Sequence, residues 1–144
     1  MITIAICEDE KKYAEYIRDF VAEVIPDVQI TYFSDAENFY DSIKHKKYDL
    51  YLLDIEMPKK NGIEIAREIR NYYKKTIIIF LTNYEEYVYD GYEVNAFRYI
   101  PKPLVKEKLK PALESAYKEY QDNNSYIFIT DVDGKQIILS IVML

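Results

Sequence analysis

Five short strand-like runs, each followed by residues with helical spacing, constrain the fold of this chain more than any other feature. Apolar side chains after the runs recur at three- and four-residue intervals, as in Ile65, Ala66 and Ile69, which is the period of an amphipathic helix. Strands that alternate with helices in this way form parallel sheets covered on both faces. The sequence therefore predicts an α/β fold, a doubly wound five-stranded parallel sheet with helices on both faces. The five runs occupy residues 2–7, 28–33, 48–54, 77–81 and 96–100.

The end of the chain departs from this alternation. Residues 126–130 and 136–144 are two further strand-like runs, and the Asp-Gly pair between them is typical of a tight turn, so we expect a C-terminal β-hairpin. The polar stretch 121–125 is expected to be a linker. Because residues 141–144 are all apolar, we also expect residues 126–144 to be the truncated start of a second domain. In the helix expected before this linker, Pro111 predicts a kink, or else a helix that begins near Pro111.

The composition limits the compartment and the class of partner. A chain of 144 residues that is 49% hydrophobic and 31% charged is long enough for one globular domain. The single cysteine, Cys7, excludes a disulfide framework, the N-terminal apolar run is too short for a signal peptide, and no run approaches the ~20 apolar residues of a membrane span. We therefore expect a cytoplasmic protein with no membrane contact. A net charge of −6 argues against nucleic-acid binding by this chain alone, because phosphate backbones are bound by clustered Lys and Arg.

Polar side chains follow four of the five predicted strands at their carboxyl ends, where parallel sheets bind ligands. These residues are far apart in the sequence, and only the fold would gather them. Taken alone, Asp54 could be a loop cap, a metal ligand or a nucleophile, so its role depends on its neighbours. The gathered residues are Glu8, Asp9 and Glu10 after the first strand, Asp54 at the end of the third, Thr82 at the end of the fourth and Lys102 after the fifth.

The gathered groups have the chemistry of a phosphoryl-transfer site. Two carboxylates at ~4 Å repel each other by about 4 kcal/mol at an effective dielectric constant of roughly 20, and a hard divalent cation such as Mg²⁺ removes that cost. An aspartate beside Mg²⁺ can attack a phosphoryl group. Lys102 would then pair with the acyl phosphate, and the Thr82 hydroxyl could hydrogen-bond to its oxygens. These residues supply all that phosphoryl transfer needs except the donor.

The order of these residues resembles that of the receiver domain of bacterial two-component response regulators, over residues 1–120. The resemblance implies a flavodoxin/CheY-like fold whose Asp54 accepts a phosphoryl group, in a Mg²⁺-dependent reaction, from a phosphohistidine on a sensor histidine kinase. Such a domain catalyses only its own phosphorylation and dephosphorylation, so we expect a signalling phosphoacceptor and not an enzyme. The residues that carry the resemblance are Glu8-Asp9, Asp54 within Asp-Ile-Glu-Met-Pro, Gly62, Thr82 and Pro101-Lys102-Pro103.

The same resemblance implies a role for each site residue. For the metal, it implies Asp9 as a direct Mg²⁺ ligand, Glu8 as a ligand through water, and Asp54 and the backbone carbonyl of Glu56 as further ligands. For the switch, it implies Thr82 as the hydroxyl that moves, Tyr99 as the aromatic residue that turns inward and Lys102 as the partner of the phosphate. Asn83 departs from the family pattern, in which a small residue usually follows the switch hydroxyl, and a larger side chain there would hinder access to the acyl phosphate.

Further features resemble one class of these regulators, the LytR/AlgR type, which carries a LytTR DNA-binding domain after the receiver. They are Asp-Ile-Glu-Met-Pro, Ala96-Phe97-Arg98-Tyr99 and the expected hairpin. This resemblance implies a receiver at residues 1–120, a linker at 121–125 and the first strands of a LytTR-type domain at 126–144. Transcription regulation through DNA would then need the part of that domain that this chain lacks.

Alternative interpretations are open at this point. A pseudo-receiver would act only as an interaction module, and its mark would be a missing site residue. A phosphatase of the haloacid dehalogenase kind would use Asp54 as its nucleophile and needs a second Asp two positions later, where this chain has Glu56. The sixteen tyrosines include a cluster at residues 84, 87, 89 and 92, which either packs internally or lines an interface. The family resemblance implies a homodimer through the 84–120 face as one such interface.

Overall fold

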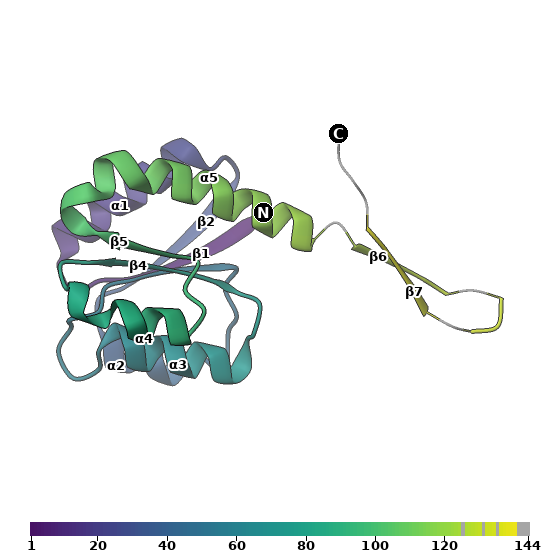
Figure 1. Cartoon of the computed structure of the whole chain (residues 1–144), viewed down its shortest axis with the longest axis horizontal. Helices are drawn as coiled ribbons and strands as arrows, with labels where there is room; N and C mark the ends of the chain where they lie inside the picture. Colours follow the sequence, from purple (N-terminus) through teal and green to yellow (C-terminus); the bar gives the residue numbers. More distant parts are fainter. Residues whose placement is uncertain (125, 131, 135, 141–144) are drawn as a thin grey trace.

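The computed structural model describes residues 1–124, 126–130, 132–134 and 136–140. Its main body is a five-stranded sheet in the order β2-β1-β3-β4-β5, in which every neighbouring pair of strands is parallel (Figure 1). The predicted doubly wound parallel sheet is confirmed. The strands are β1 (Ile2–Cys7), β2 (Val28–Phe33), β3 (Leu50–Leu53), β4 (Ile77–Thr82) and β5 (Arg98–Pro101).

Helices cover both faces of the sheet. Figure 1 shows α1 and α5 on one face and α2, α3 and α4 on the other. No helix in the described part of the chain combines the length and the apolar composition that a membrane span needs. The helices are α1 (Lys11–Val24), α2 (Ala36–Ser42), α3 (Gly62–Tyr72), α4 (Val88–Glu93) and α5 (Val105–Asn123), with the 3-10 turns η1 (Glu85–Tyr87) before α4 and η2 (Lys102–Leu104) before α5.

The sheet separates two hydrophobic cores. Alternate residues of β1 enter opposite cores: Ile4 and Ile6 pack with residues of α1 and α5, whereas Ala5 and Cys7 pack with residues of α2 and α3. Strand β3 lies in the middle of the sheet and all of its residues are buried, which accounts for its unbroken apolar run. Because β3 is central, Asp54, the residue after it, lies at the middle of the carboxyl edge of the sheet.

Polar caps fix where two of the helices begin. The Asn61 side chain accepts a hydrogen bond from the backbone N–H of Glu64 at 2.9 Å, and the Glu64 side chain completes a capping box at the start of α3. Asp35 caps α2, and its side chain accepts from the backbone N–H groups of Glu37 and Asn38. The β3–α3 loop, which carries Asp54, therefore ends at a defined residue.

Helix α5 differs from expectation at two places. It begins at Val105 and continues through Pro111, so the alternative that the helix begins near Pro111 is wrong. It also includes residues 121–123, which we expected in the linker. The physical reason is that Tyr120 still packs against the core one turn before the helix ends. Asn124 then terminates the helix, donating from its backbone N–H and its side-chain amide to the Tyr120 carbonyl at 3.1 and 2.7 Å.

The expected C-terminal hairpin is present. Strands β6 (Tyr126–Thr130) and β7 (Gln136–Ser140) pair antiparallel as a separate two-stranded sheet, with Thr130 opposite Gln136 (Figure 1). Gly134 has a φ of 83°, a left-handed conformation that favours glycine, as expected of the Asp-Gly turn. The predicted extension of the second strand over residues 141–144 lies outside the described residues.

Candidate functional site

The carboxyl ends of the strands bring together the side chains that the sequence singled out. Lys102, directly after β5, places its Nζ 3.0 Å from Glu8 Oε2 and 3.1 Å from Asp54 Oδ2. Glu8, Asp9 and Asp54 each have a carboxylate oxygen within 4.8 Å of those of the other two. Lys102 and Glu8 are 94 positions apart in the sequence, yet they are in direct contact at one edge of the sheet. The predicted gathering of these residues is observed.

Lys102 balances part of a buried negative charge. Glu8 is 4% exposed and Asp54 is 7% exposed. Burial and then the charge of Asp54 raise the pKa of Glu8 to about 7, although the hydrogen bonds from Lys102 and from the Glu10 backbone act in the opposite direction. Burial acts to lower the pKa of Lys102, but the hydrogen bonds and charges of Glu8 and Asp54 outweigh it, and the pKa is raised. The ammonium group is therefore held in its charged form between two carboxylates.

The Asp54 carboxylate is fixed at both oxygens. Its Oδ1 accepts a hydrogen bond from the backbone N–H of Ile55 at 2.7 Å, and its Oδ2 faces the Lys102 ammonium. The backbone N–H of Asp54 in turn donates to the Cys7 carbonyl at 3.0 Å, which extends the pairing of β1 and β3 by one residue. A carboxylate held in one orientation in this way has little freedom left to lose when it reacts.

The donor set fits a divalent cation. Lys102 pairs with two of the three clustered acidic side chains, Glu8 and Asp54, so Asp9 is left outside these ion pairs. Asp9 is exposed, and its carboxylate makes no hydrogen bond or ion pair with any residue that the structure describes. Hard oxygen donors with one side open to solvent suit Mg²⁺, which keeps several of its waters when it binds protein.

A chain of hydrogen bonds joins Thr82 to Tyr99 through the backbone of Tyr84. Thr82 is buried, and its Oγ1 accepts from the Tyr84 N–H at 3.3 Å. The carbonyl of the same Tyr84 accepts a hydrogen bond from the Tyr99 hydroxyl. Tyr99 is half-buried, and its ring lies against Phe80 with the two centroids 5.8 Å apart. The two predicted switch residues are thus connected through one residue of the β4–α4 loop.

Glu56, in the loop that carries Asp54, affects the hydroxyl of Tyr84. A hydrogen bond to the Glu56 carboxylate, and then the charge of that carboxylate, raise the pKa of the Tyr84 hydroxyl. Glu56 follows Asp54 by two residues and its side chain is exposed. Asn83, between Thr82 and Tyr84, is exposed as well. The charge of Glu56 in the β3–α3 loop therefore acts on Tyr84 in the β4–α4 loop.

Sequence reasoning missed two tyrosines that belong to this region. The Tyr32 hydroxyl donates to the backbone carbonyl of Glu8 at 2.9 Å, and the ring of Tyr13 lies against Lys102, whose Nζ is 4.4 Å from the ring centroid. Tyr13 fits the helical spacing of the run after the first strand, which indicates core packing and gives no signal of a place at the site.

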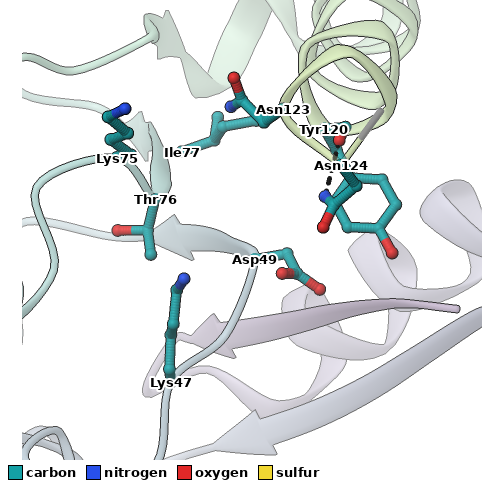
Figure 2. A pocket seen from close by; sticks show the side chains of 8 residues that line it. All are labelled: Lys47, Asp49, Lys75, Thr76, Ile77, Tyr120, Asn123 and Asn124. Atoms are coloured by element: carbon teal, nitrogen blue, oxygen red, sulfur yellow. Dashed lines mark hydrogen bonds between the residues drawn. The ribbon is translucent and has the colours of Figure 1, made fainter. Parts of the chain in front are cut away.

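The opposite edge of the sheet has a separate hollow of about 170 Å³ (Figure 2). The Asp49 carboxylate there accepts hydrogen bonds from the backbone N–H and the hydroxyl of Thr3, both at 2.9 Å, so it joins the starts of β1 and β3. No predicted site residue lines this hollow, which is remote from Asp54. Its lining residues are Lys47, Asp49, Lys75, Thr76, Ile77, Tyr120, Asn123 and Asn124.

Comparison with known sequences identifies the family of the fold and the site. Residues 4–114 match the family model described as the response regulator receiver domain. An uncharacterized response regulatory protein of Vibrio cholerae is 31% identical over 124 residues, which are 84% of this chain and 47% of that protein. The sensory transduction protein LytT of Bacillus subtilis is 25% identical over 122 residues, which are 85% of this chain and 51% of LytT. This chain thus spans about half the length of the curated relatives it matches.

Solved structures agree with this assignment. The response regulator TrrA of Thermotoga maritima, determined in complex with Mg²⁺-BeF, is 31% identical with a TM-score of 0.70, and the match covers 81% of this chain and 99% of TrrA. The response regulatory domain of mrkE from Klebsiella pneumoniae is 26% identical with a TM-score of 0.74, and the match covers 83% of this chain and 98% of that domain. Sequence, fold and the acidic edge of the sheet lead to one conclusion: this chain belongs to the response regulator receiver domain family.

Proposed function

We propose that Asp54 accepts a phosphoryl group from a phosphohistidine on a sensor histidine kinase, and that the 84–120 face changes in response. The observation that carries this proposal is the Asp54 carboxylate itself, held between the Ile55 N–H and the Lys102 ammonium beside two further carboxylates. Membership of the receiver family supports the same role. Because the curated relatives are about twice as long as this chain, the proposal concerns this domain within a larger regulator.

The transfer exchanges one bond to phosphorus for another. An oxygen of the Asp54 carboxylate attacks the phosphorus, an O–P bond forms, and the P–N bond to the kinase imidazole breaks. The imidazole nitrogen keeps the electron pair and is then protonated. Lys102 pairs with an oxygen of the acyl phosphate as charge accumulates there. Thr82 is positioned to donate a second hydrogen bond, because its oxygen accepts from the Tyr84 N–H and its own proton remains available.

We assign the Mg²⁺ ligands to the acidic cluster. Asp9 and Asp54 would bind the ion directly, Glu8 through water, and the backbone carbonyl of Glu56 would contribute a further oxygen. When bound, Mg²⁺ offsets the negative charge of the carboxylates and of the phosphoryl oxygens. The fit of three carboxylates within 4.8 Å supports this assignment, and the solved relative TrrA is described in complex with Mg²⁺-BeF.

The proposed output is a change at the 84–120 face. Movement of Thr82 toward the phosphoryl group would break the hydrogen bond that its Oγ1 accepts from the Tyr84 N–H. The Tyr84 carbonyl accepts the hydrogen bond of the Tyr99 hydroxyl, so a shift of Tyr84 would release Tyr99 to turn inward. Tyr89 and Tyr92, on the same face, are 72% and 79% exposed. Exposed aromatic residues of this kind suit a protein interface, and we propose a homodimer through this face.

The last part of the chain bears on the boundary of the receiver domain. We propose that the receiver occupies residues 1–120, that residues 121–123 at the end of α5 carry the chain on from it, and that residues 126–144 begin a LytTR-type domain. The relatives named LytT and LytR, which are about twice as long as the matched region, support this division. DNA binding would then belong to the part of that domain absent here, and the whole regulator would act in the cytoplasm.

The test is intact mass after incubation with acetyl phosphate, with and without Mg²⁺. We expect a gain of one phosphoryl group that depends on Mg²⁺ and is lost in Asp54→Asn. Asp35→Asn is the matched control, because it also removes an aspartate charge while Asn caps a helix as well as Asp. Full labelling of Asp54→Asn would contradict the assignment.

Intact mass and a second assay distinguish this proposal from a pseudo-receiver and from a phosphatase. A pseudo-receiver would gain no mass under either condition. A phosphatase would instead turn over a generic phosphoester such as p-nitrophenyl phosphate for many cycles, whereas we propose chemistry limited to the domain's own phosphorylation and dephosphorylation.

A further inference from the structure

The Lys102 ammonium has three neighbours, and the third is an aromatic ring. Besides Glu8 and Asp54, its Nζ lies 4.4 Å from the centroid of the Tyr13 ring. Tyr13 comes from α1, whereas Lys102 opens η2 at the other side of the site. The Lys102 side chain is only 14% exposed, so this contact is largely shielded from water. A cation against a ring face is attracted most strongly when it is desolvated in this way.

The Tyr13 hydroxyl does not explain why the residue is there. It is buried, and it has no hydrogen-bond partner among the residues that the structure describes. A cavity of only about 10 Å³ lies beside Tyr13, Glu8 and Asp54. Burying an unpaired hydroxyl is unfavourable, so the part of Tyr13 that serves the site is its ring.

The ring differs from the other two neighbours because it has no charge. Glu8 and Asp54 belong to the acidic cluster that fits a divalent cation, and Asp54 is also the proposed phosphoacceptor. The attraction of both carboxylates for Lys102 therefore weakens whenever they share their charge with a metal ion or a phosphoryl group. The ring carries no formal charge that a metal ion or a phosphoryl group could neutralise, so neither of them weakens its attraction for the ammonium directly.

We propose that Tyr13 is a positioning residue that keeps the Lys102 ammonium over Asp54 while the carboxylates change partners. This inference rests on the proposed function, in which Lys102 pairs with the acyl phosphate. It gives a role to one of the sixteen tyrosines whose abundance the composition left unexplained.

The test compares the rate of labelling by acetyl phosphate at saturating Mg²⁺ in variants of Tyr13. Tyr13→Phe keeps the ring and should label within about twofold of the native rate. Tyr13→Met and Tyr13→Leu fill the space without a ring, and they should label roughly 30-fold more slowly, the scale of a desolvated cation–π contact. Rescue by Phe but not by Met separates the ring from simple packing. Equal rates for Phe, Met and native protein would overturn the inference.

A double-mutant cycle by urea unfolding provides an independent test. If Tyr13 acts through Lys102, the destabilisation caused by Tyr13→Met should be smaller in the Lys102→Met background than in the native one. Additive effects would overturn the inference. A failure of this inference can be told apart from a failure of the proposed function. If the proposed function is wrong, the native protein will not be labelled. If only this inference is wrong, the native protein is labelled, but the Tyr13 variants do not differ from one another.

Discussion

Gly62 is a residue at which the backbone of the β3–α3 loop leaves no room for a side chain. A Cβ at this position would overlap the carbonyl oxygen of Asp54 and lie 2.9 Å from the Ile55 Cα. The Gly62 N–H also donates to the Ile55 carbonyl at 2.7 Å, so the two segments cannot separate without losing that bond. Its φ is not left-handed, and close approach alone accounts for the glycine.

Gly62→Ala should therefore disturb both the fold and the site. We expect a loss of about 1 to 3 kcal/mol in the free energy of unfolding, the range for overpacked positions, and slower labelling of Asp54 because its backbone must shift. Urea unfolding and the rate of labelling by acetyl phosphate measure the two effects. Gly134→Ala is the control: no atom lies within 4 Å of its Cβ, and we expect the labelling rate to stay native. Native stability and rate in Gly62→Ala would contradict this account.

At the residue scale, the sequence predicts which groups meet but not how they pair. Asp54 and Lys102 follow different strands, and the rule that strand ends share an edge was enough to bring them together. That Lys102 bridges Glu8 and Asp54 depends on which of two adjacent acidic side chains is buried. Glu8 and Asp9 look alike in the sequence, yet Glu8 is buried and Asp9 is exposed. Tyr13 was missed for a related reason, because a tyrosine on an apolar helix face is also what ordinary core packing produces.

At the scale of elements, Arg70 joins three segments on the side of the sheet that carries α3. Its guanidinium donates to the carbonyls of Thr76 and Val94, each at 2.7 Å, and of Asn95 at 3.1 Å. It thereby links the end of α3, the start of β4 and the end of α4. Burial lowers the pKa of Arg70, and no carboxylate accepts from it among the hydrogen bonds that the structure describes. Its partners are backbone carbonyls and the Thr76 hydroxyl, which lies 3.2 Å away.

Arg70→Lys should be destabilising although it conserves the charge. One ammonium cannot reach carbonyls that lie around a planar guanidinium, so we expect a loss of about 2 to 3 kcal/mol in the free energy of unfolding. Arg67→Lys, on the same helix, is the matched control, because Arg67 makes only an exposed ion pair with Asp90 at 3.4 Å. We expect that variant to change stability by less than about 0.5 kcal/mol. Equal unfolding midpoints in urea for Arg70→Lys and Arg67→Lys would show that the hydrogen bonds of Arg70 add no stability.

Strands and helices could be predicted from the sequence where the burial of their side chains alone determines them. The runs of β1, β2 and β4 are apolar or alternating and begin at the predicted residues. Boundaries failed where one tertiary contact overrides the local signal. Polar residues 121–123 resemble a linker, but they complete a helix whose Tyr120 is still packed. Pro111 weakens a helix locally, but the buried Leu109 and Leu113 on either side hold α5 in place.

For the whole molecule, the question is whether the hairpin contributes to the domain that carries the site. Both hydrophobic cores described by the structure draw their side chains from residues 2–120. Strands β6 and β7 pair with each other and with no strand of the large sheet. An isolated two-stranded hairpin adds little stability in water. The sequence predicts a domain boundary here, because the hairpin follows the polar stretch 121–125 and departs from the alternation of strands and helices.

A chain that ends after Asn124 should therefore keep the fold and the chemistry. It retains the Asn124 cap of α5, so we expect its free energy of unfolding to match that of the full chain within about 0.5 kcal/mol, and its Asp54 to be labelled at the same rate. A chain that ends after Ala116 is the control, since it loses Tyr117 and Tyr120, which pack against the core, and should be less stable by about 2 kcal/mol or more. Urea unfolding compares the three chains. If removal of the hairpin alone destabilised the protein as much as the longer truncation, the hairpin would be part of the receiver, and the division between residues 1–120 and 126–144 would be wrong.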